Sequence, residues 1–240
     1  QNWIWLQPEF FPESWSLAVE EWFYLGFPIL ICFFGRRISS PGKAFLLATI
    51  AFFLLPLVLR GFNAFILERP FDSGMRKMVV MRLDSLMFGV FAAYVKKFHP
   101  ERFYRWKLSK WVMGLVLCIT VFHFLNTLDL DASAWMKTFG FTATSIGAAL
   151  MLPFFDAWKS ASSKIATGIT CISLWSYSLY LCHRPVAVLL QHFLHAENTL
   201  SPSAGLTGFF IYVPVSIILS ALCFRYYEKP MTQLRERFRS

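Results

Sequence analysis

The sequence AFLLATIAFFLLPLVL, residues 44–59, lies between Lys43 and Arg60 and contains no charged side chain. Its residues are apolar on nearly every side of a helix, whereas the strand of a membrane barrel alternates apolar and polar positions. A helix over residues 43–60 is close to the roughly 17–25 residues that cross a hydrocarbon core of about 30 Å. The segment therefore predicts a membrane-spanning helix.

Similar apolar segments recur along the 240 residues, which are 56% hydrophobic and only 15% charged. That apolar content exceeds what one compact soluble core requires. We expect an all-α, polytopic transmembrane bundle of about seven spans, forming a single membrane domain over residues 1–240. The predicted spans cover residues 15–35, 43–60, 80–95, 111–128, 136–155, 168–194 and 206–225.

The net charge of +9 comes from basic residues in short loops between the apolar segments. They form no continuous stripe, so we expect no nucleic-acid partner. Most of them fall on one side, near residues 36–43, 96–110 and 159–164 and in the tail after Arg225. Because cytoplasmic loops carry an excess of Lys and Arg, this asymmetry predicts an outside N-terminus and a cytoplasmic C-terminus. We expect the membrane to be the cell inner membrane.

The segment PESWSLAVEEWFYL, residues 12–25, places two carboxylates inside the first predicted span. If the helix begins near Ser14, Glu20 and Glu21 lie roughly 8–10 Å below its outer end. Carboxylates in a span usually face a bundle interior or a wet cavity. Adjacent helical residues point about 100° apart, so we favour Glu20, one turn from Ser16, for a shared pocket. The alternative is a glutamate that pairs with an arginine only to hold helices together.

A second polar cluster, MRLDSLMFG, opens the third predicted span at residues 81–89. Arg82 and Asp84 are two residues apart, so they face different directions and are expected to have different partners. Arg82 is predicted at the outer depth of Glu20 and can pair with it. It can also clamp a substrate carboxylate or phosphate, or stabilise a developing oxyanion. A structural buried ion pair is the alternative.

The third cluster is SLWSYSLYLCHRP, residues 173–185. Pro185 interrupts the backbone hydrogen bonding of a helix and predicts a kink there. His183 and Arg184 are then expected near mid-membrane depth, where His183 can act as a general base. A hydrogen-bonded helix contact is the alternative for the histidine. At helical spacing a polar stripe gathers on one face: Ser173, Ser176, Tyr177, Tyr180, His183 and Arg184.

Two weaker patterns are a pair of histidines and a loop rich in basic and aromatic residues. His192 and His195 are spaced like a metal pair on a helix, but no third ligand follows, so no metal site is expected. The loop over residues 96–110 interleaves basic and aromatic side chains. It suits the phosphates of a nucleotide-bearing acyl donor or of an anionic lipid, and cytoplasmic topology explains the same charges.

These three clusters and one further segment resemble segments of a single family. SWSLAVEEWFYL, residues 14–25, closely resembles the signature of the acyltransferase 3 family of polytopic membrane O-acyltransferases. RLDSLMFG at 82–89, YSLYLCHRP at 177–185 and YEKP at 227–230 resemble three further family segments, in the family's order. The likeness therefore covers nearly the whole chain.

The resemblance implies transfer of an acyl group, commonly acetyl from acetyl-CoA, to a hydroxyl of a cell-surface glycan or glycosylated acceptor, with no permanently bound cofactor. It also implies further helices before this portion, carrying an arginine–histidine motif. A transporter or flippase, in which the same charges carry protons or substrate, is the alternative. The expected catalytic residues are Glu20, Glu21, Arg82 and His183, and the expected substrate-binding residues are Ser14, Trp15, Ser16, Asp84, Tyr180 and Arg184.

Overall fold

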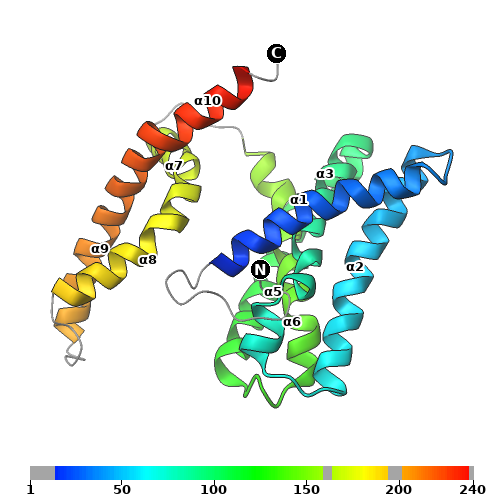
Figure 1. Ribbon diagram of the computed structural model, residues 1–240, viewed down its shortest axis with the longest axis horizontal. Helices are drawn as coiled ribbons and strands as arrows, with labels where there is room; N and C mark the ends of the chain where they lie inside the picture. Colours follow the sequence, from blue (N-terminus) through cyan, green and yellow to red (C-terminus); the bar gives the residue numbers. More distant parts are fainter. Residues whose placement is uncertain (1–13, 159–163, 194–201, 238–240) are drawn as a thin grey trace. The chain divides into compact units, whose positions relative to one another are not determined.

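The computed structural model describes residues 14–158, 164–193 and 202–237 (Figure 1). Its regular structure is helical throughout, and the described residues contain no strand, as predicted. The helices form two compact units, residues 1–159 and 160–240. The single membrane domain predicted from the sequence stays a prediction.

The first unit contains six α-helices within its described residues, with two short helical turns, η1 and η2, before α3. Their bounds are α1 (Ser14–Gly35), α2 (Pro41–Phe65), η1 (Asp72–Arg76), η2 (Val79–Met81), α3 (Leu83–Phe98), α4 (Pro100–Tyr104), α5 (Lys107–Thr127) and α6 (Ala134–Asp156). The second unit comprises α7 (Lys164–Leu174), α8 (Ser176–Phe193), α9 (Pro202–Cys223), η3 (Phe224–Glu228) and α10 (Lys229–Arg237).

Five described helical segments are long and apolar enough to cross a membrane: Ser14–Gly35, Pro41–Phe65, Lys107–Thr127, Ala134–Asp156 and Gly208–Leu234. Helices also occupy the other two predicted spans, 80–95 and 168–194, but neither span holds a single helix that is both long and apolar enough. The prediction of about seven spans is therefore not confirmed as a count.

Local features of the backbone account for both cases. The third predicted span, 80–95, begins with the tight turn η2, so α3 has only 16 residues. At 1.5 Å per residue it extends about 24 Å, less than a hydrocarbon core. The sixth predicted span, 168–194, is interrupted at Trp175, which separates α7 from α8, whereas Pro185 lies inside α8.

Many large apolar side chains face outward from the long helices. Leu54 and Val58 of α2 and Phe122 of α5 are exposed at the surface of their unit. A helix that is apolar all round is stable only where its surroundings are apolar as well. The outward faces are therefore those of helices that lie in lipid.

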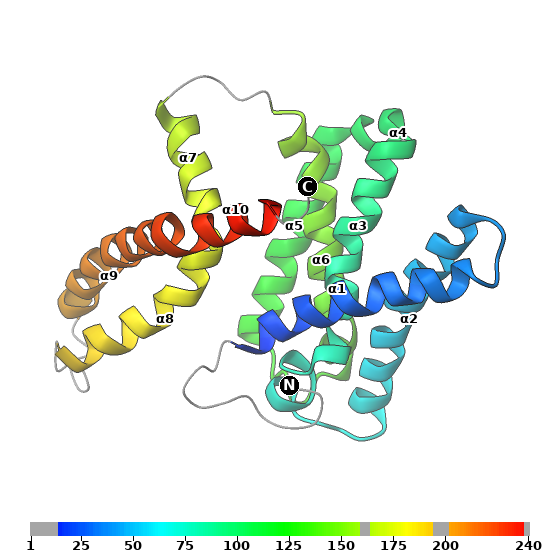
Figure 2. The same cartoon turned by 45° about the horizontal axis from the view of Figure 1, so that its top comes forward.

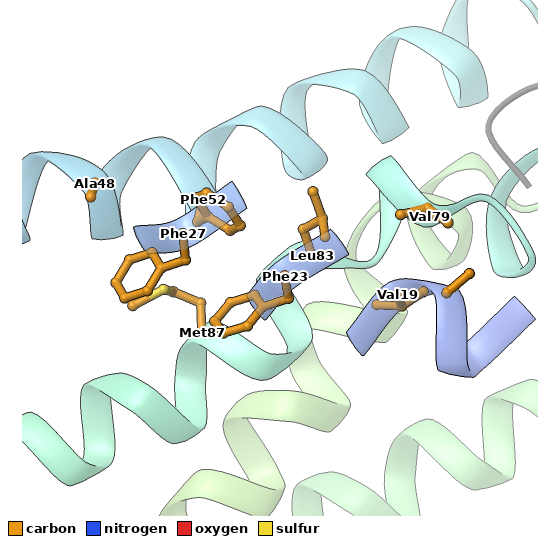
Figure 3. Packing of buried hydrophobic residues seen from close by; sticks show 9 residues of the cluster. Val19, Phe23, Phe27, Ala48, Phe52, Val79, Leu83 and Met87 are labelled. Carbon is orange, nitrogen blue, oxygen red and sulfur yellow. The ribbon is translucent and has the colours of Figure 1, made fainter. Parts of the chain in front are cut away.

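The buried core of the first unit lies between α1, α2 and α3 (Figure 3). Val19, Phe23 and Phe27 recur at four-residue spacing and so lie along one face of α1. The Phe52 ring of α2 meets the Phe23 and Phe27 rings edge-on, with centroids 5.4 Å away in both cases. Met87 of α3 completes the cluster and is fully buried. This packing holds the first turns of α1 beside the start of α3.

Helices α5 and α6 lie side by side and pack through small residues (Figure 2). A Cβ atom added to Gly147 would lie 2.6 Å from the Cys118 sulfur and 3.0 Å from the Gly114 carbonyl oxygen. Small residues that let two backbones approach this closely are typical of membrane helix pairs. The pair places Thr138 and Thr142 of α6 at fixed positions facing α2 and α3.

Candidate functional site

A buried ion pair joins α2, α3 and α6. The Arg60 guanidinium donates from Nη1 to Asp84 Oδ1 at 2.9 Å and from Nη2 to Asp84 Oδ2 at 2.7 Å. Arg60 Nε donates to the Thr138 carbonyl at 2.9 Å, Nη1 also donates to the Met81 carbonyl, and Nη2 also donates to Thr142 Oγ1 at 2.6 Å. Arginine has five N–H donors, so every one is used.

Both partners of this ion pair are completely shielded from solvent. The Thr142 hydroxyl donates to Asp84 Oδ2 at 2.9 Å, so both oxygens of the carboxylate accept hydrogen bonds. Such saturation compensates the desolvation of the two charges. Asp84 was predicted to bind substrate, but the structure gives its carboxylate to Arg60 and Thr142, an arrangement that fixes the start of α3.

Arg60 was missed as a site residue by the sequence reasoning. The predicted span ended at Arg60, which placed its charge at the membrane surface, whereas α2 continues to Phe65 and keeps the residue inside the helix. The available signal was Asp84, because a carboxylate in an apolar helix requires a cation. The predicted difference between the partners of Arg82 and Asp84 is consistent with the geometry.

Arg82 lies at the N-terminus of α3 in an aromatic environment. Its guanidinium carbon is 4.3 Å from the centre of the Phe141 ring and 5.6 Å from that of Trp15. Nε of Arg82 is buried and has no hydrogen-bond partner among the described residues. No described carboxylate forms an ion pair with Arg82. A desolvated cation between aromatic faces is suited to binding an anion.

A second arginine, Arg76 from the segment before α3, also lies near the Trp15 ring. The Arg76 guanidinium lies 5.7 Å from the Trp15 ring centre, but it also pairs with Asp72, as does Lys77. Partial burial acts to raise the pKa of Asp72, and hydrogen bonds from Lys77 and Arg76 outweigh it and hold the pKa below its ordinary value. Arg76, unlike Arg82, therefore has a carboxylate partner, which it shares with Lys77.

The other predicted residues of α1 lie near its N-terminal end. Ser14 and Ser16 are half-buried in its first turn, beside Trp15. Glu20 and Glu21 are exposed on the surface of the first unit, and within its described residues neither forms an ion pair. The structure therefore brings Trp15 to Arg82 but forms no pair between Glu20 and Arg82.

His183 belongs to α8 of the second unit. Its Nδ1 lies 2.6 Å from the Tyr180 carbonyl oxygen and 3.3 Å from that of Leu179. Because a carbonyl only accepts, Nδ1 carries the proton in a neutral ring, and Nε2 keeps its lone pair. Sequence reasoning predicted this residue as a base, and the hydrogen bond gives the tautomer that such a role requires.

A cavity of about 430 Å³ lies beside this histidine. His183 and Tyr180 of α8 form one wall, and Tyr212 and Ser216 of α9 contribute to the other. Arg184 is exposed and has interactions of its own. The structure therefore brings the predicted residues Tyr180 and His183 to one cavity. Arg184 is not among the described residues that line it.

Metal binding finds no support within the described part of the chain. No group of three or more His, Cys, Asp or Glu side chains there is arranged to hold a metal ion. The side chains of His192 and His195, the possible pair considered from the sequence, lie outside the described residues.

The sequence of the chain matches known proteins over most of its length. The family model described as an acyltransferase domain matches residues 1–225. The O-acetyltransferase OatA of Staphylococcus aureus strain NCTC 8325 / PS 47 is 27% identical over 231 residues, which cover 90% of this chain and 35% of the relative. The OatA proteins of strains COL and MRSA252 match to the same extent.

The chain spans about a third of the length of these curated relatives. No solved structure matches it. The family match covers both units, including the segments with Trp15, Arg82 and His183. Because the family model matches most of its length, the chain belongs to the acyltransferase 3 family.

Proposed function

We propose that the full protein is an inner-membrane O-acyltransferase that moves an acyl group, acetyl in the first instance, from acyl-CoA to a hydroxyl of a cell-surface glycan or glycosylated acceptor. Family membership supports acyl transfer. The names of the OatA relatives specify acetyl and an oxygen acceptor. The donor and the glycan acceptor are part of the proposal.

The reaction sets two chemical requirements. The hydroxyl oxygen attacks the thioester carbonyl carbon, a C–O bond forms, the C–S bond breaks, and coenzyme A leaves as its thiol. The hydroxyl proton must pass to a base, and the tetrahedral intermediate needs a positive group for its oxyanion.

The observation that carries the proposal is that Arg82 has a buried hydrogen-bond donor without a partner among the described residues. Arg60 and Arg82 are both buried or half-buried in the first unit, and Arg60 has all its donors engaged. Arg82 instead has a buried Nε without a partner and no ion pair among the described residues. A preorganised, desolvated cation is worth most where charge develops in the transition state. Arg82 therefore serves as the oxyanion or substrate-anion group, with Trp15 as a flat surface for the acceptor.

Within the second unit, His183 is the candidate for a general base, because its Nδ1–H bond to the Tyr180 carbonyl leaves Nε2 able to accept a proton. Glu20 and Glu21 are the alternatives, and both are carboxylates without a described cationic partner. Ser14 and Ser16 supply hydroxyls beside Trp15 for hydrogen bonding to a polyol, and Tyr180 and Arg184 supply polar groups in α8.

The gene-deletion experiment tests the proposed activity. Ester content of surface glycans is measured by mass spectrometry in the deletion strain and after complementation with the wild type or with Glu20→Gln. Loss of esters on deletion and their return with the wild-type gene are expected. Unchanged ester content on deletion would contradict the enzyme, whereas full restoration by Glu20→Gln would remove only Glu20 from the mechanism.

A further inference from the structure

Two cavities of the first unit meet at Lys110 and Leu150. One has a volume of about 470 Å³ and an almost entirely apolar wall, which includes Phe53 and Leu57 of α2 and Phe88 of α3. The other, also about 470 Å³, carries three cationic side chains: Arg102 of α4, Arg105 of the short connection to α5, and Lys110 of α5. The rest of its wall is Trp106, Ser109, Met113 and Leu150. Both volumes are within the roughly 300–1,000 Å³ typical of small-molecule sites.

The second cavity carries positive charge that nothing described neutralises. Arg102 and Arg105 line it and form no ion pair with any described carboxylate. Asp156, the acid at this end of α6, pairs with Lys96 and accepts a hydrogen bond from Tyr104 at 2.5 Å. The two arginines are therefore available to an external anion.

Lys110 connects this charge to the apolar cavity, because it lines both. Its Nζ donates to the carbonyls of Arg102 at 2.7 Å and Phe103 at 3.1 Å. A lysine ammonium has three donors, so one remains. These two bonds also tie the C-terminal part of α4, which carries Arg102, to α5.

The surroundings of the cavities indicate a membrane interface rather than an aqueous ligand. Leu54 and Phe91 are exposed on the wall of the apolar cavity, so it opens at the lipid-facing surface of the unit. Trp106, on the wall of the cationic cavity, is exposed and adopts a left-handed backbone conformation with φ of 62°. Tryptophans of this kind concentrate at the level of lipid headgroups.

We propose that an anionic phospholipid occupies the two cavities together. Its phosphate lies against Arg102, Arg105 and the remaining donor of Lys110, and one acyl chain lies in the apolar cavity. Charge complementarity selects the headgroup, and apolar burial holds the chain. This site is independent of the proposed acyl transfer.

Native mass spectrometry of the full protein, released from detergent with added phosphatidylglycerol or phosphatidylcholine, tests the site. We expect retained phosphatidylglycerol and little phosphatidylcholine. In Arg102→Gln/Arg105→Gln, affinity for phosphatidylglycerol should fall about thirtyfold, since each interfacial cation contributes about 1 kcal/mol. The matched control Arg36→Gln/Arg37→Gln removes the same charge from the loop after α1 and should leave binding within about twofold.

A second variant pair tests the acyl-chain part. Ala92 lines the apolar cavity, whereas its neighbour Ala93 is exposed and does not. Ala92→Phe should weaken phosphatidylglycerol binding and Ala93→Phe should not. Equal losses in the two arginine double variants, or no loss in Ala92→Phe, would overturn the proposal. Displacement of the lipid by inorganic pyrophosphate would also overturn it, in favour of a site for soluble phosphates.

Discussion

Arg60 and Asp84 form a bidentate, fully buried ion pair between α2 and α3, and Thr142 of α6 hydrogen-bonds to both. The neighbouring arginine, Arg82, is left with aromatic contacts. The Arg60–Asp84 pair thus connects three helices and has a structural role. Arg82, by contrast, has a buried Nε donor that no described residue uses.

Breaking this joint should destabilise the protein strongly. Arg60→Met leaves the Asp84 carboxylate buried without its cation, and loss of one partner of a buried pair costs about 3–5 kcal/mol. The free energy of unfolding in mixed micelles measures the effect. Arg60→Met/Asp84→Leu removes both charges and should recover much of the loss. A double variant as unstable as the single variant would contradict this account of the pair.

Thr142→Val should have a smaller effect than Arg60→Met. It removes one hydroxyl that donates to Asp84 and accepts from Arg60, while the ion pair itself remains. Loss of such a hydrogen bond costs about 1–3 kcal/mol. The same unfolding assay applies, with Thr127→Val as control, because the Thr127 hydroxyl is exposed and bonds only within α5.

Enlarging Gly147 should separate α5 from α6. A Cβ at this position meets the Cys118 sulfur and the Gly114 carbonyl, so Gly147→Leu should lower the thermal midpoint of the purified protein. Gly89→Leu is the control, because nothing lies within 4 Å of a Cβ added at Gly89. Equal midpoints for the two variants would show that close packing at Gly147 is unimportant.

The segment between α2 and α3, which contains Asp72, should contribute stability that depends on pH. The pKa of Asp72 is below its ordinary value of 3.8 in the folded protein, because hydrogen bonds from Lys77 and Arg76 outweigh the opposing effect of burial. A depressed folded pKa gives stability that is present above the unfolded pKa and lost as pH falls through the folded one. Asp72→Asn should therefore lower the thermal midpoint at about pH 6 and have little effect near pH 2. An equal effect at both pH values would contradict the ion pair.

Much of the fold could be predicted because the apolar segments are long. Helices occupy all seven predicted segments, and the described residues contain no strand. The predicted spans failed where local backbone decided the outcome: the turn Val79–Met81 shortens α3, and the interruption at Trp175 divides α7 from α8. Hydropathy is averaged over many residues, so it does not reveal a turn of only one to three residues.

The site was predictable only in part, for a physical reason. Spacing within one helix showed that Arg82 and Asp84 need different partners, and the structure agrees. The partners themselves lie on other helices, since Arg60 is on α2 and Phe141 on α6. Which side chains meet across helices depends on packing, so Arg60 could not be assigned to Asp84 from spacing alone.

His183 should be required for activity but not for folding. His183→Gln removes the basic Nε2 and should lower acylation about 10²–10⁴-fold, the usual contribution of a general base. His123→Gln is the control, because His123 is an exposed histidine of α5. Both variants should reach wild-type levels in the membrane. Normal acylation by His183→Gln would assign the proton to another group, with Glu20 the next to test.

The most direct test of the proposed mechanism compares two arginines that contact the same tryptophan, Arg82 and Arg76. Deletion cells are complemented with the wild type, Arg82→Gln or Arg76→Gln at matched membrane levels, and the O-acetyl ester content of their surface glycans is measured with time. We predict that Arg82→Gln lowers the acylation rate about 10²–10³-fold, as loss of an oxyanion-stabilising group does. Arg76→Gln should keep most of the wild-type acylation rate. A wild-type rate in Arg82→Gln cells would contradict the proposed role of Arg82.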